Sequence, residues 1–177
     1  VENSCIVTKT ALSDAEFIDF NKVGALESFN TDGLRSILFT MGHIPNMKEK
    51  TLRYPGHIDL MKSLIKAGFL NTEAIQYKGQ SISPLGFTSA LFFDQWKLGA
   101  TEAEFTLMTI EIKGEGKTIH YELYDEYDAV TETSSMSRTT GYTCTAALNM
   151  LMENLFTEKG VFPPELVGKY EPCFQYI

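Results

Sequence analysis

The sequence is poor in the residues that build self-sufficient catalytic or metal sites. Its 177 residues include only three histidines and three cysteines. No HExxH zinc motif, CxxC pair, GxSxG nucleophile turn or glycine-rich phosphate loop occurs in it. The closest glycine pair, Gly114 and Gly116, lies between two strand-like segments and therefore indicates a hairpin. We expect no metal site and no nucleotide site within these residues.

Disulfides, membrane spans and excess positive charge are also missing. Cys5, Cys144 and Cys173 are odd in number and widely spaced, which excludes a regular disulfide framework and predicts a reducing, cytoplasmic compartment. The longest apolar runs, such as residues 90–93, are far shorter than a bilayer span of about 20 residues. The formal net charge of −8 disfavours binding to nucleic acid or to an anionic membrane. We therefore expect neither as a partner.

Positive charge is nevertheless concentrated in one stretch, residues 48–57, which reads KEKTLRYPGH. If residues 47–54 form a strand, Thr51 and Arg53 lie on one face of it. The planar guanidinium of Arg53 suits a carboxylate, and a helix that begins after Pro55 adds free backbone N–H groups beside it. The alternative is an edge strand whose charged side chains face water.

Two further residues lie at predicted helix starts. His57 either titrates near neutral pH and acts as an acid or base, or is a partly exposed residue bonded to nearby backbone. Arg138 stands before the Thr139–Gly141 segment, where it is either a ligand for an anion or a surface arginine beside a structural cap. The residues alone leave both choices open.

Apolar periodicity and turn residues predict alternating helices and strands. We expect strands at residues 6–7, 23–29, 47–54, 105–113 and 117–125. We expect helices in three places: a short one capped by Asp32, one from Gly56 to Gly68 with Lys62 and Lys66 outside, and one from the polar loop at 134–141 to near Lys159. The predicted class is α+β, with a mixed, largely antiparallel sheet and helices packed on one face.

Four stretches together resemble the saccharopine dehydrogenase-like family. They are NTDGLRS at 30–36, EKTLRYPGH at 49–57, SMSRTTGY at 135–142 and GVFPPEL at 160–166, in matching order and spacing. The family includes the saccharopine dehydrogenase that forms glutamate and aminoadipate semialdehyde, and lysine 6-dehydrogenase. As the resemblance implies, these enzymes oxidise a C–N bond with NAD or NADP on a Rossmann domain. A second domain holds the amino-acid substrate and forms the dimer.

The resemblance implies that residues 1–177 are a single substrate-binding and dimerisation domain. Its cofactor, NAD or NADP, would be bound mainly by a Rossmann domain outside these residues, so the isolated domain is expected to be inactive. The expected partners are an amino-acid substrate and a second copy of the chain. The substrate-contact residues it implies are Thr51, Leu52, Arg53 on a carboxylate, Asn30, Thr31, Asp32 and Arg138. His57 is the candidate catalytic residue.

One residue departs from the pattern of the family. Glutamate-forming saccharopine enzymes carry an arginine between the Asn and Asp of the turn at 30–32, where this sequence has Thr31. The turn is more similar to the lysine 6-dehydrogenase branch, so the resemblance leaves the choice between lysine and saccharopine open. The alternative function is a non-catalytic homologous module that senses a ligand or dimerises.

Overall fold

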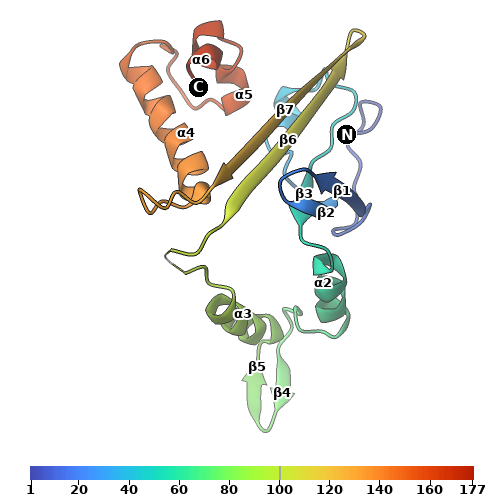
Figure 1. The fold of residues 1–177 in the computed structure, drawn as a ribbon. Helices are drawn as coiled ribbons and strands as arrows, with labels where there is room; N and C mark the ends of the chain where they lie inside the picture. Colours follow the sequence, from blue (N-terminus) through green and yellow to red (C-terminus); the bar gives the residue numbers. More distant parts are fainter. Residues whose placement is uncertain (100) are drawn as a thin grey trace. The chain divides into compact units, whose positions relative to one another are not determined.

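The computed structural model describes residues 1–99 and 101–177, which divide into two compact units, Val1–Lys97 and Leu98–Ile177. Every strand ladder in the described residues is antiparallel, and helices accompany the ladders in both units (Figure 1). The predicted α+β class is therefore confirmed. Within these residues no helix has both the length and the apolar composition to cross a bilayer. The prediction of one substrate-binding domain over residues 1–177 stays a prediction.

A three-stranded sheet forms the centre of the first unit. Its strands are β1 (Glu16–Phe20), β2 (Gly24–Asn30) and β3 (Lys50–Arg53), in the order β1-β2-β3. Residues 26–29 of the central strand are buried, because β2 has a neighbour on each side. The β2–β3 register places Glu27 opposite Arg53 and Phe29 opposite Thr51. The charged stretch thus provides the edge strand of this sheet.

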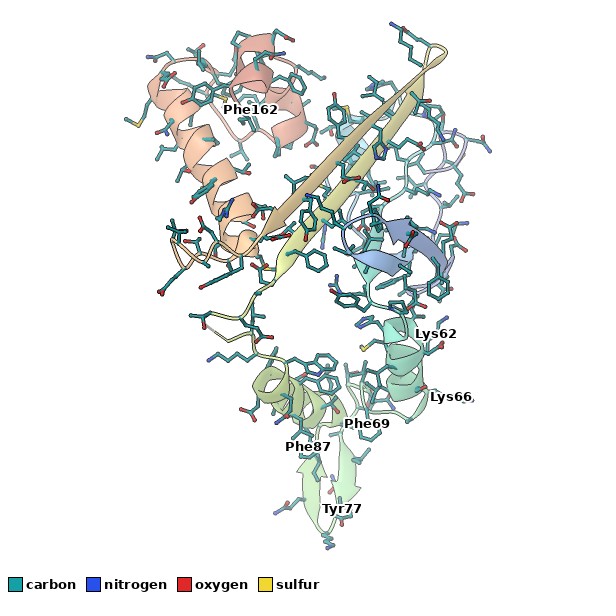
Figure 2. The ribbon with its side chains drawn as sticks, in the orientation of Figure 1. Lys62, Lys66, Phe69, Tyr77, Phe87 and Phe162 are labelled. Atoms are coloured by element: carbon teal, nitrogen blue, oxygen red, sulfur yellow. The ribbon has the colours of Figure 1, made fainter. Side chains whose placement is uncertain are left out.

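The helix predicted after the charged stretch is α2 (His57–Lys66). Gly56, with φ of +93°, supplies the left-handed turn that starts it. Ile58 is buried, and Lys62 and Lys66 are exposed and project from the helix (Figure 2). The unit also contains α1 (Ile37–Thr40), the hairpin of β4 (Ile75–Tyr77) and β5 (Gln80–Ile82), and α3 (Pro84–Gln95).

The second unit is built on the predicted hairpin, β6 (Phe105–Gly114) and β7 (Lys117–Glu126). Glu115 and Gly116 both have positive φ, as a two-residue type I′ turn requires. The chain continues through α4 (Ser135–Met152), α5 (Pro164–Val167) and α6 (Glu171–Tyr176). Met150, Phe156 and Cys173 form the buried cluster of this unit, and Phe162 packs edge-to-face on Phe156 at 5.2 Å between ring centroids (Figure 2).

Three local predictions are wrong. Residues 6–7 are not a strand, because the only pairing there is an isolated bridge between Glu2 and Cys5. Asp32 does not cap α1, which begins only after Arg35 has taken a left-handed φ of 44°. Helix α4 ends at Met152 and not near Lys159, because Asn154 adopts a left-handed φ of 58° that ends the helix.

Candidate functional site

One face of the first sheet gathers several of the predicted site residues. Side chains opposite each other on paired strands share a face, so Glu27, Phe29, Thr51 and Arg53 lie on the same side of β2 and β3. The start of α2 packs on that side. The His57 ring stacks on Phe29 with 5.9 Å between centroids, and the Ile58 N–H donates to Glu27 Oε2 at 3.2 Å. We call Glu27, Phe29, Thr51, Arg53 and His57 the Arg53 face.

Arg53 brings a positive charge that this unit does not neutralise. Its side chain is exposed, and Nη1 donates to the Leu52 carbonyl at 2.8 Å. Within the described residues it forms no ion pair, although Glu27 lies directly across the ladder. A guanidinium carries five donors, so most of them are left for an anion or for water. The position on an edge strand also agrees with the water-facing alternative.

The expectation of free backbone N–H groups at the start of α2 is wrong for its first two residues. The His57 N–H donates to the Tyr54 carbonyl at 3.3 Å, and the Ile58 N–H is bound by Glu27. Arg53 is therefore the better anion donor at this end of the site, and the helix start serves mainly to anchor the Glu27 carboxylate.

The electrostatics of the face keep His57 neutral at neutral pH. Burial lowers the pKa of His57 below its usual value of 6.5, because the charged ring loses hydration. The positive charge of Arg53 lowers this pKa further, whereas the carboxylate of Glu27 opposes the shift. A neutral imidazole has one ring nitrogen with a lone pair, so His57 is in the form that accepts a proton.

Hydrogen bonds hold the turn at residues 30–33 next to Thr51. The Thr31 hydroxyl donates to Glu49 Oε2, which also accepts from the Gly33 N–H at 3.0 Å. Since that hydroxyl has only one proton, the 2.9 Å contact between the Thr31 and Thr51 oxygens has Thr51 as its donor. A side chain at Gly33 would meet the end of the Glu49 side chain, which would have to move and give up its contacts to the turn. The structure thus brings Thr31 and Thr51 together.

The other two residues of the turn have local partners. The Asn30 amide donates to Ser13 Oγ at 3.0 Å and to Asp14 Oδ2 at 2.8 Å, which ties down the segment before β1. Asp32 is highly exposed and forms an ion pair with Arg35, at 3.4 Å. Their substrate roles stay predictions.

Two predicted site residues are not brought onto the Arg53 face. Leu52 pairs with Ser28, and alternation puts both on the opposite side of the sheet. Arg138 belongs to the second unit, where its guanidinium lies 2.8 Å from Asp125 Oδ1 and 3.7 Å from Asp128 Oδ2. Because Arg138 already has two carboxylate partners, its charge is balanced within its own unit.

Glu27 is the residue of this face that the sequence reasoning missed. Its side chain is only 7% exposed, yet it carries a carboxylate into the contact between β2 and α2. The available signal was a single acid inside the apolar run of residues 23–29, since a charge in a buried strand requires a partner or a use.

The described residues do not fit a nicotinamide dinucleotide. A Rossmann site needs a glycine-rich turn between a parallel strand and a helix, and all strand pairs here are antiparallel. The closely spaced Gly114 and Gly116 form a hairpin turn. We therefore derive no chemical step through NAD or NADP at these residues.

Fold and site define an α+β domain with Arg53 and His57 on one sheet face, and residues 1–99 and 101–177 contain no dinucleotide-binding fold. A family model described as the saccharopine dehydrogenase C-terminal domain matches residues 1–177, and the chain belongs to that family. The family is one of NAD(P)-dependent dehydrogenases, so the domain is related to oxidoreductases.

Proposed function

We propose that the chain is the substrate-binding and dimerisation domain of an NAD(P)-dependent, saccharopine dehydrogenase-like oxidoreductase. Its substrate is an amino acid of the lysine or saccharopine type, oxidised at a C–N bond. A separate dinucleotide-binding domain supplies the cofactor. The observation that carries this proposal is the guanidinium of Arg53, which forms no ion pair among the described residues, on the face that also presents Thr51 and the His57 ring.

Each of these three residues has a distinct task in the proposal. Arg53 holds a substrate carboxylate through charge-assisted hydrogen bonds. Thr51 donates to Thr31, so its two lone pairs remain to accept from a substrate N–H. Oxidation at a C–N bond requires an amine with a free lone pair, so the substrate ammonium must first lose a proton. His57 is the base we assign to that proton transfer.

Ligand titration by NMR tests this role. We expect L-lysine or L-saccharopine to shift the ring signal of His57, which is one of only three histidines. Arg53→Gln should weaken the binding about tenfold to a hundredfold, as expected for loss of a charge-assisted contact. Arg35→Gln is the matched control, because Arg35 is an exposed arginine of the same unit already paired with Asp32. The proposal is contradicted if neither ligand binds. It is also contradicted if Arg53→Gln and Arg35→Gln weaken binding equally.

The dimerisation part of the proposal rests on the β6–β7 hairpin. One of its faces presents three consecutive cross-strand pairs of apolar side chains, each 36–51% exposed. These pairs are Met108 with Leu123, Ile110 with Tyr121, and Ile112 with Ile119. The other face of the same ribbon is largely polar towards the turn, with Thr109 opposite Glu122 and Glu111 opposite His120. A contiguous apolar stripe with a polar reverse side marks an interaction surface.

The occupant we propose for this stripe is a second copy of the same hairpin. On β7, Ile119 and Leu123 lie on the apolar face, two residues before and two residues after Tyr121. A two-fold axis at Tyr121 would therefore set Ile119 of one copy opposite Leu123 of the other. The stripe is thus complementary to itself in apolar character.

Sedimentation analysis of two matched variants tests this surface. We expect the wild-type chain to be a dimer, Ile110→Lys to be a monomer, and Thr109→Lys to remain a dimer, because Thr109 lies on the opposite face of the same strand. Circular dichroism checks that both variants keep the fold. A monomeric wild type, or an Ile110→Lys variant that still dimerises, contradicts the surface.

A further inference from the structure

The buried carboxylate of Glu27 stands directly across the ladder from the unpaired guanidinium of Arg53. Opposite residues of an antiparallel pair have Cβ atoms about 4.5–5.5 Å apart. The two charged groups nevertheless do not pair, since Arg53 turns to the Leu52 carbonyl and Glu27 to the Ile58 N–H. The face therefore presents a carboxylate and a guanidinium side by side, and each can still form further hydrogen bonds.

Only one of the two carboxylate oxygens of Glu27 takes part in a hydrogen bond within the described residues. Oε2 accepts from Ile58, whereas Oε1 has no hydrogen-bond partner among the residues that the structure describes. Glu27 Oε1 is also not among the fully enclosed atoms without a partner, which are Ser28 Oγ and Asp125 Oδ2. Since the start of α2 fixes the carboxylate through Oε2, Oε1 is held in place and is not fully enclosed, although the residue is only 7% exposed.

We propose that Glu27 binds the α-ammonium group of the substrate while Arg53 binds its α-carboxylate. The inference rests on the function proposed above and deepens it, because it adds the residue that recognises an α-amino acid and not merely a carboxylic acid. A zwitterionic α-amino acid carries its two charges on groups attached to the same carbon, a spacing that one cross-strand pair can match. The positive end of α2 stabilises the Glu27 carboxylate in the absence of substrate.

A purely structural role for Glu27 predicts a different outcome. As a cap of α2, Glu27 would support the whole face, and its loss would weaken every ligand alike. As the ammonium site, it affects only ligands that carry an α-ammonium. Glu27→Gln separates the two roles, because the amide oxygen still accepts from the Ile58 N–H while the charge is lost.

The test crosses two variants with three probes in NMR titrations of the full chain. The probes are L-lysine, 6-aminohexanoate, which lacks the α-amine, and 1,5-diaminopentane, which lacks the carboxylate. Glu27→Gln should weaken L-lysine about tenfold to a hundredfold and leave 6-aminohexanoate unchanged. Arg53→Gln should weaken L-lysine and leave 1,5-diaminopentane unchanged. Asp59→Asn, an exposed acid in the first turn of α2, is the control and should change none of the three affinities.

The outcomes distinguish this inference from the proposed function. If neither L-lysine nor L-saccharopine binds the wild-type chain, the proposed function and this inference both fail. If L-lysine binds and depends on Arg53, but Glu27→Gln leaves its affinity unchanged, the inference alone is overturned. Equal weakening of L-lysine and 6-aminohexanoate by Glu27→Gln also overturns it, since that pattern belongs to a structural cap.

Discussion

Replacing Arg138 by glutamine should destabilise the second unit and leave amino-acid binding to the first unit intact. The Arg138 and Asp125 side chains are only 28% and 20% exposed, and their 2.8 Å contact is a charge-assisted hydrogen bond. Asp125 Oδ2 is buried without a partner, so the substitution leaves a mostly buried carboxylate with neither oxygen paired to a cation. The family resemblance assigns Arg138 to the substrate, and this experiment separates that role from a structural one.

The magnitude follows from the burial of the pair. A fully exposed ion pair contributes about 0–1 kcal/mol, and a hydrogen bond to a charged group about 1.5–3 kcal/mol. Arg138→Gln should therefore cost about 2–3 kcal/mol of unfolding free energy. Asp125→Asn should cost about 1–2 kcal/mol, because Arg138 retains Asp128 at 3.7 Å. The double variant should reveal a coupling of about 1–2 kcal/mol.

Urea denaturation followed by two probes measures these values. Far-ultraviolet circular dichroism reports helices of both units, whereas the single tryptophan, Trp96, reports the first unit. Arg35→Gln, which removes an arginine from an exposed pair, should change stability by no more than about 0.5 kcal/mol. If Arg138→Gln unfolds at the wild-type urea concentration and weakens L-lysine binding, the structural assignment is wrong and the substrate role implied by the family holds.

Four further predictions concern His57, Phe156 and Gly56. The His57 ring should titrate below pH 6.5 by NMR. Glu27→Gln should lower the pKa of His57 further, and Arg53→Gln should raise it. The assigned electrostatics are wrong if Glu27→Gln raises this pKa and Arg53→Gln lowers it. The folded-state pKa of His57 lies below the unfolded value of about 6.5, so the folded form binds fewer protons than the unfolded form. The unfolding free energy should therefore fall as the pH drops from 6.5 through the folded pKa. His57→Gln should abolish this fall. Phe156→Ala should cost about 3–5 kcal/mol by circular dichroism, since the ring is 7% exposed, and a cost below 1 kcal/mol would mean that the cluster is not a core. Gly56→Ala should cost about 1–2 kcal/mol by tryptophan fluorescence, because its φ of +93° is strained for alanine although no atom lies within contact distance of the added carbon.

Strong local signals accounted for the elements that the sequence predicted. The Gly114–Gly116 turn between alternating segments predicted β6 and β7, and Gly56 before an apolar periodicity predicted α2. Strand β1 lacks such a signal, because it owes its pairing to β2. Helices α3 and α5 do carry one that we did not use, since they begin at Pro84 and Pro164 and proline is favoured at the first position of a helix.

The site residues also differ in whether a local sequence signal predicts their position. Arg53, Thr51 and His57 lie in one contiguous stretch, where strand alternation and a helix start predict that they share a neighbourhood. Glu27 lies 26 residues before Arg53, so only the pairing register brings the two together. Nothing local in either strand sets that register, which depends on burying Leu26 and Phe29.

If the proposed function holds, amino-acid recognition depends on this register. A slip of one residue would set Ser28 or Leu26 opposite Arg53 and turn the Glu27 carboxylate to the other face of the sheet. Two anchors oppose such a slip, the Ile58 N–H on Glu27 and the Thr31 and Gly33 contacts to Glu49 at the far end of the β2–β3 pair. On the proposed function, the alignment of the strands decides whether the acid and the arginine face one ligand together, so the turn at 30–33 would also act on specificity through that alignment.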